Sequence, residues 1–192
     1  MFDNSLDKFE DEQKIESKRS LKVQSQEIEN KFRFDINKFI DGWKLSAGLM
    51  AQYVSYNADL YNKISTELMD GQGNVTVPEK VIRFNNDINF FKYGAFFQSS
   101  KNLFNEKLLI SAGIRTDLNS FTSGGNNPLK TLSPRLSLAY HIDPKWDINA
   151  SVGTYFKIPT YTTLGYLNNA GVAVNKNLDY IQSTHYVIGT QF

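Results

Sequence analysis

Two opposite charges, Arg115 and Asp117, stand two residues apart in a segment of alternating polarity. Residues i and i+2 of a β-strand point to the same side, so these two charges would share one face. Such a pair could belong to a charged patch that binds a ligand. It could equally form a structural ion network with neighbouring parts of the protein, and exposed ion pairs of that kind contribute little binding or stability.

A second group of polar and aromatic residues surrounds Pro159. Aromatic rings and amides of this kind can bind sugars and metal chelates, although similar side chains also line loops without a ligand. Asn168, Asn169, Asn175 and Asn177 add hydrogen-bonding capacity to the same segment. The candidate ligand contacts are therefore Arg115, Asp117, Tyr155, Lys157, Tyr161 and Tyr166.

Other chemistries have little support. His141 and His185 are the two histidines, and their places along the chain make a shared metal site unexpected. Asp143 and Asp147 flank a short turn and are expected to be turn and strand residues, not an acid/base pair. Gly124-Gly125 lacks the strand-to-helix context of a phosphate-binding loop. We expect no catalytic residue, no metal, no cofactor and no enzyme activity.

The elements that position these residues are β-strands. From Trp146 to Lys157 the chain alternates between apolar and polar or small residues, which predicts a strand between unlike environments. Similar patterns predict about seven antiparallel strands, joined alternately by short turns and long connections such as 57–86, 119–131 and 158–181. A short strand near Val75 to Val77 is possible within the first of these. The predicted strands cover about 28–36, 43–53, 88–100, 108–117, 135–142, 146–157 and 182–192. Short and long connections alternate in this way in transmembrane β-barrels.

Aromatic positions favour lipid over a protein core on the apolar side. Both tryptophans begin a strand directly after a short turn, and other aromatic residues end strands on the same parity. Aromatic residues at both strand ends are typical of the interfacial girdles of a membrane barrel. The predicted girdle is Trp43, Tyr53, Tyr140, Trp146 and Phe156. The opposite parity carries Lys44 and Arg135, which need water or partners.

Composition narrows the classes further. The chain has 192 residues, of which 41% are hydrophobic, and 21 basic against 20 acidic residues give no case for nucleic-acid binding. No apolar run is long enough for a membrane helix. Residues 1–20 are rich in charge and predict a solvated loop or frayed segment, with a partial transmembrane barrel domain over 21–192. No apolar secretion segment follows Met1, so an exported protein would not begin here.

Several stretches resemble the barrel of TonB-dependent outer-membrane receptors, from about Glu29 to the end. They are Glu29 to Asp35, Gly42 to Gly48, Tyr93 to Gln98, Ser111 to Asp117, Ser133 to Tyr140 and Gly153 to Pro159. The resemblance implies an all-β, antiparallel up-and-down meander that forms part of a barrel in the outer membrane. It also implies lipid, a plug domain, the TonB complex and a scarce ligand as partners, the ligand being an iron chelate, cobalamin or a glycan.

The chain departs from that family pattern because no plug is recognisable and the strands are too few to close such a barrel. We therefore expect an internal fragment of a receptor, or a split or truncated gene product, that does not transport alone. Phe192 resembles the terminal aromatic residue of outer-membrane barrels, whereas the family continues beyond this point. Two alternatives stay open: a small structural or adhesive outer-membrane barrel, and a soluble carbohydrate-binding β-sandwich.

Overall fold

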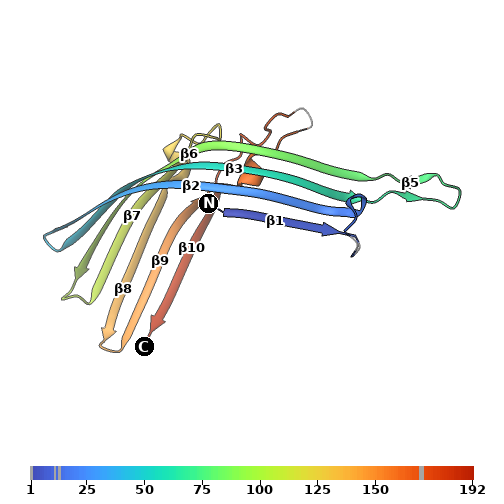
Figure 1. The fold of residues 1–192 in the computed structure, drawn as a ribbon. Helices are drawn as coiled ribbons and strands as arrows, with labels where there is room; N and C mark the ends of the chain where they lie inside the picture. Colours follow the sequence, from blue (N-terminus) through green and yellow to red (C-terminus); the bar gives the residue numbers. More distant parts are fainter. Residues whose placement is uncertain (1, 11, 13, 169–170) are drawn as a thin grey trace. The chain divides into compact units, whose positions relative to one another are not determined.

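The computed structural model of the protein describes residues 2–10, 12, 14–168 and 171–192. Its main feature is an eight-stranded sheet in the order β1-β2-β3-β6-β7-β8-β9-β10, with a separate two-stranded sheet of β4 and β5 (Figure 1). Successive long strands pair antiparallel, which confirms the all-β meander. The strands are β1 (Phe2–Phe9), β2 (Arg19–Ile40), β3 (Trp43–Ser65), β4 (Leu68–Met69), β5 (Val75–Val77), β6 (Lys80–Leu103), β7 (Leu108–Asn119), β8 (Ser133–Asp143), β9 (Trp146–Lys157) and β10 (Ile181–Gln191).

Strand β1 corrects the expectation of a loop or frayed segment over residues 1–20. It pairs with β2 from Phe2, opposite Glu27, to Phe9. The guanidinium of Arg19 binds the Asp7 carboxylate, with Nε to Oδ1 at 2.9 Å. Backbone pairing and this ion pair hold a segment that has too little apolar periodicity to be recognised as a strand. Residues 1, 11 and 13 lie outside the described residues.

The strands fall into two length classes. β2, β3 and β6 have 22, 23 and 24 residues, whereas β7 to β10 have 11 or 12. The long strands are shared between two compact units. Unit 1 comprises Met1–Glu29, Val54–Asn89 and Thr160–Asn175; unit 2 comprises Asn30–Tyr53, Phe90–Pro159 and Lys176–Phe192.

The faces of the long strands exchange polarity where the units divide. Within unit 2, β3 has apolar residues at odd positions, such as Leu45 and Leu49, and polar ones at even positions. Within unit 1 the even positions are apolar and buried, as at Val54 and Ala58, and the odd positions are polar. β6 changes in the same way after Phe90. This change of phase is why the sequence predicts a polar connection over 57–86, whereas β3 extends to Ser65 and β6 begins at Lys80.

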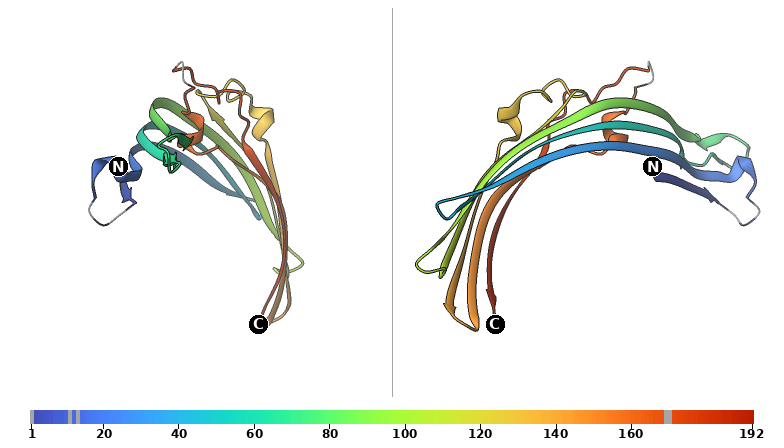
Figure 2. Two further views of the ribbon diagram at one scale, coloured as in Figure 1. Left: turned by 90° about the vertical axis from the view of Figure 1, so that its right-hand side faces the viewer. Right: turned by 60° about the vertical axis from the view of Figure 1, so that its left-hand side comes forward.

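The buried face of unit 1 is covered by a segment from the connection between β9 and β10. The short helix α1 (Tyr161–Leu164) lies beside β3 and β6 (Figure 2), and Leu164 is fully buried. The hydroxyl of Tyr56 hydrogen-bonds that of Thr162 at 2.7 Å, and the amide of Asn86 donates to the Tyr161 carbonyl at 3.2 Å. The core of unit 1 is thus closed by a loop, not by a second sheet.

The alternation of short and long connections is confirmed. β2 and β3 are joined by Asp41 and Gly42, whose φ angles of 49° and 77° are those of a tight hairpin. The β8–β9 turn is held by the Asp143 carboxylate, which accepts the backbone N–H of Lys145 at 2.8 Å. The long connections cover 66–79, 120–132 and 158–180, and the first contains the predicted strand β5.

Candidate functional site

The two faces of the unit 2 sheet differ in chemistry. One face exposes large apolar side chains, among them Phe34, Leu49 and Ile148, which are 51%, 61% and 40% exposed. Monomeric soluble proteins rarely expose contiguous apolar patches beyond a few hundred square ångströms. The other face presents hydroxyls, amides, glycines and arginines. Strand register places Gly113 opposite Arg135 and Arg135 opposite Gly153, so these three belong to one row of that polar face.

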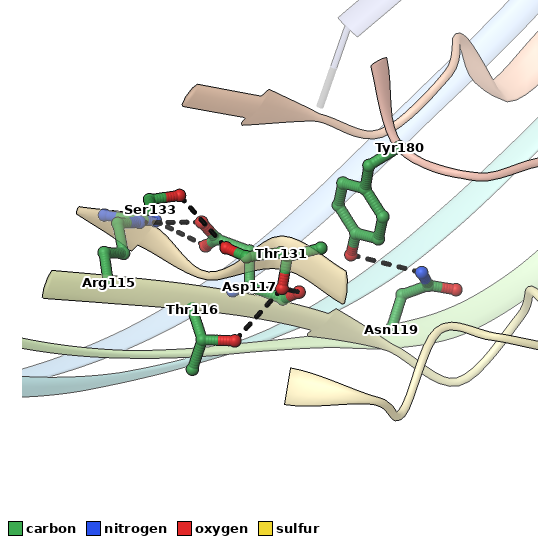
Figure 3. A network of polar contacts seen from close by, with 7 residues as sticks. All are labelled: Arg115, Thr116, Asp117, Asn119, Thr131, Ser133 and Tyr180. Carbon is green, nitrogen blue, oxygen red and sulfur yellow. Dashed lines mark hydrogen bonds and ion pairs between the residues drawn. The ribbon is translucent and has the colours of Figure 1, made fainter. Parts of the chain in front are cut away.

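Arg115 and Asp117 lie on the polar face of β7 and bind each other. Arg115 donates from Nε to Asp117 Oδ2 at 2.8 Å and from Nη2 to Oδ1 at 2.6 Å (Figure 3). This is a bidentate arginine–carboxylate pair, the strongest common ion-pair geometry. The spacing of these residues predicted their shared face. The contact itself largely neutralises Asp117, so the pair alone carries little excess charge.

Tyr155 occupies the centre of a small aromatic cluster on the same face. Its ring lies 4.4 Å from the Arg135 guanidinium carbon and 4.8 Å from the His185 ring. It also folds back over Gly153, where an added Cβ would stand 3.2 Å from the Tyr155 hydroxyl. The missing side chain of Gly153 therefore makes room for the ring, and the ring holds the Arg135 guanidinium by a cation–π contact.

A cavity of about 300 Å³ opens between β3, β6, β7, β8 and the end of β9. We call it the basic cavity. Its lining includes four basic side chains and one carboxylate, that of Asp117. Among the lining residues are Gln52, Lys92, Arg115, Arg135, Lys157 and Tyr180. A second cavity, of about 400 Å³, shares Arg115, Arg135 and Tyr155 with it. The two therefore adjoin along the polar face.

Tyr180, just before β10, closes one side of the basic cavity. Its hydroxyl accepts a hydrogen bond from the Asn119 amide at 3.1 Å (Figure 3). Burial raises the pKa of the Tyr180 phenol, and the nearby charge of Asp117 acts in the same direction, against the lowering effect of Asn119. Tyr180 is therefore a neutral polar wall at physiological pH.

Tyr161 and Tyr166 belong to unit 1, whereas the four other candidate residues belong to unit 2. The Tyr161 hydroxyl donates to Glu29 Oε1 at 2.6 Å, and its ring packs on Tyr56. Tyr166 stacks on Phe84 with ring centroids 5.4 Å apart, while 43% of it is exposed. Both therefore support the covering loop, and Tyr166 keeps a face available to solvent. Asn168 stabilises a turn of the same loop, because its side-chain oxygen accepts a hydrogen bond from the backbone N–H of Val172. Asn169 lies outside the described residues.

The predicted girdle residues cluster at the ends of the apolar face. Tyr53 packs on Phe91 at 5.2 Å between ring centroids, and Trp146 packs on Phe192 at 4.9 Å. Trp43, Tyr53, Tyr140 and Trp146 are each between 38% and 44% exposed, and Phe156 is partly exposed. Rings that pair with each other and still face outward suit a membrane interface.

The histidines have separate partners. His141 Nδ1 bonds the Asp147 carboxylate, and His185 packs on Tyr155. Among the described residues, no group of three or more histidine or acidic side chains could hold a metal ion. Within the same residues, no helix has the length and apolarity to cross a membrane.

Comparison with known families agrees with this geometry. The family model described as "TonB dependent receptor-like, beta-barrel" matches residues 4–192. The chain belongs to this family. No curated protein matches the chain. The match covers most of the segment expected to be a loop, including most of β1. This TonB-dependent receptor barrel resides in the Gram-negative outer membrane, and its exposed apolar face suits contact with lipid.

The family also addresses the alternatives left open by the sequence. TonB-dependent receptors are transporters, not enzymes, and they interact with a plug and the TonB complex. A soluble sandwich would need two facing sheets, whereas the described residues form one large sheet and a two-stranded hairpin. The other alternative, a small structural or adhesive outer-membrane barrel, does not fit the matched family, which is one of receptors.

Sequence reasoning overlooked several residues of the basic cavity as site candidates, Arg135 of β8 among them. Gln52, Lys92 and Tyr180 come from β3, β6 and the connection before β10. Gln52 shares the polar parity of its strand, which is a usable signal. Its meeting with Arg115 depends on how β3, β6 and β7 are aligned, and a single sequence does not state that alignment.

Proposed function

We propose that the polar face of unit 2 lines the path along which this TonB-dependent receptor passes its ligand. The observation that carries the proposal is the division of one sheet into an exposed apolar face and a polar face with two adjoining cavities. Arg115, Asp117, Tyr155 and Lys157 line those cavities. In this role the strands exclude lipid, and the long connections meet the ligand outside the cell.

The ligand belongs to the scarce nutrients that such receptors import, namely iron chelates, cobalamin or glycans. Tyr166 supports a contact in the long connection after β9, because its ring is stacked on one side and exposed on the other. Tyr161 contributes by holding that connection in place through Glu29. The plug of the receptor gates the passage and is moved by the TonB complex.

A growth assay tests the proposal. The encoding gene is deleted in its host, and growth is followed while iron chelates, cobalamin or single glycans are limiting. We expect growth to fail on one of these classes and to return with the wild-type gene. Unchanged growth on every ligand would contradict an import role.

Variants then test the path. Tyr155→Ala combined with Lys157→Gln is expected to restore growth only at higher ligand concentration, at equal abundance in the outer membrane. The matched control is Lys145→Gln, which removes a charge in the β8–β9 turn and should restore growth fully. Equal behaviour of the two variants would remove Tyr155 and Lys157 from the path.

A further inference from the structure

Gln52, one of the residues that line the basic cavity, carries a buried donor without a partner. Gln52 is 4% exposed, and its Nε2 has no hydrogen-bond acceptor among the atoms of the described residues. Buried polar groups in folded proteins nearly always have a partner, so a buried unpaired amide calls for an explanation such as an absent ligand. The Nε2 group offers two N–H donors and no acceptor.

The side chain of Gln52 belongs to the face on which the cavity opens. Met50, two residues earlier on the same face, approaches Gly94, where an added Cβ would lie 3.4 Å from Met50 Cε and 3.1 Å from Asp117 Oδ1. The polar faces of β3, β6 and β7 therefore meet at this point. Gln52 and Asp117 both line the basic cavity.

The charges around this donor are unbalanced. Arg115 and Asp117 satisfy each other through two hydrogen bonds. Arg135 is held over the Tyr155 ring, a contact that orients a cation without cancelling its charge. Within the described residues, neither Arg135 nor Lys157 forms an ion pair with a carboxylate.

We propose that the basic cavity binds an anionic group of the ligand, a carboxylate or a phosphate. Arg135 and Lys157 supply the charge, the Gln52 amide donates to an anion oxygen, and Tyr180 adds a neutral hydroxyl. A volume of about 300 Å³ is at the small end of ligand sites and suits one charged group of a larger molecule. This inference rests on the proposed ligand path and narrows it to acidic chelates or acidic glycans.

Calorimetry on the protein, purified from outer membranes in non-ionic detergent, tests the site with citrate and inorganic phosphate as probes. We expect citrate or phosphate to bind and the neutral ester triethyl citrate not to bind. Binding of one probe but not the other identifies the anionic group. If neither anion binds, or if the ester binds as well as citrate, the proposal is wrong.

Variants locate the binding. Gln52→Glu places a carboxylate at the donor position and should abolish anion binding, while Arg135→Gln and Lys157→Gln should each weaken it at least about tenfold, as expected for loss of a charge-assisted hydrogen bond. The matched control is Lys107→Gln, which removes one positive charge in the β6–β7 turn and should leave affinity unchanged. Equal weakening by Lys107→Gln would mean that overall charge, not this cavity, binds the probe.

Growth and anion binding together distinguish the import proposal from the anion-site proposal. If growth depends on the gene but no anion binds, the receptor role stands and the anion site is wrong. If Gln52→Glu does not fold, as judged by circular dichroism at equal yield, Arg135→Gln and Lys157→Gln still decide the question because both residues are exposed.

Discussion

Glycines on the polar face make room for the side chains that shape the cavities. Gly153 accepts the ring of Tyr155, and Gly48 accepts the ring of Phe96, whose other contact is the Arg33 guanidinium at 5.6 Å. In both cases an aromatic ring packs over a glycine and makes a cation–π contact with an arginine guanidinium. The cationic groups on this face are therefore positioned by packing as much as by charge.

Gly48→Ala tests this role. An added Cβ would lie 2.4 Å from Phe96 Cε1, 2.3 Å from Asp35 Oδ1 and 2.9 Å from the Phe34 carbonyl oxygen, which is backbone. Overpacking of this kind typically costs 1–3 kcal/mol, and we expect about 2 kcal/mol here. Urea unfolding in phospholipid vesicles measures the change. Gly113→Ala is the control: its nearest neighbour is at 3.3 Å. Equal costs at the two positions would contradict the packing argument.

Tyr180 gives a prediction for alkaline pH. Because burial raises its pKa, the folded protein favours the neutral phenol. This preference stabilises the fold fully below the ordinary tyrosine pKa, and the stabilisation declines as pH rises through the raised folded value. Ultraviolet titration of phenolate should show one transition above the ordinary range that disappears in Tyr180→Phe. If Tyr180→Phe removes a transition in the ordinary range instead, Tyr180 is not buried.

At the scale of the strand, a positive charge introduced into β9 should cost more stability on the apolar face than on the polar face. Ile148 and Val152 are 40% and 37% exposed and share the apolar parity of β9, whereas Ser151 has the polar parity. Ile148→Lys or Val152→Lys should destabilise the folded protein by about 2–4 kcal/mol near the bilayer midplane, and Ser151→Lys by much less. Unfolding in vesicles measures all three. Similar costs on both faces would contradict a polar lumen.

The same strand shows which elements a sequence can predict. The alternation over Trp146 to Lys157 holds one phase throughout, and β9 has those bounds. β3 and β6 could not be predicted to their full lengths because the parity of their apolar residues changes after Tyr53 in β3 and after Phe90 in β6, although even positions are the buried ones on both sides of the change. Period-two reasoning assumes constant surroundings along a strand. β3 and β6 break that assumption, because the side that carries their apolar residues changes along the strand, and part of each therefore resembles a polar connection.

For the whole molecule, the candidate site was predictable only in part. Spacing alone placed Arg115 and Asp117 on one face, and their bidentate contact agrees. The basic cavity needs residues from five strands and from the connection before β10, and its shape follows from how these segments are aligned. Tyr161 was proposed from its loop position, yet its hydroxyl is engaged by Glu29, more than a hundred residues earlier in the chain. Contacts of such long range leave no local pattern.

The orientation in the membrane can be tested directly because the chain has no cysteine. Gln72 lies in the turn between β4 and β5, within a long connection, and Lys145 lies in the short β8–β9 turn. Long connections of outer-membrane barrels face the exterior and short turns the periplasm. On intact cells an impermeant maleimide should therefore modify Gln72→Cys but not Lys145→Cys, and both after lysis. Leu49→Cys, on the lipid face, should react poorly in either case. Because the two exposed positions differ only in the side they occupy, the reverse labelling pattern would mean an inverted barrel and would place the basic cavity away from incoming ligand.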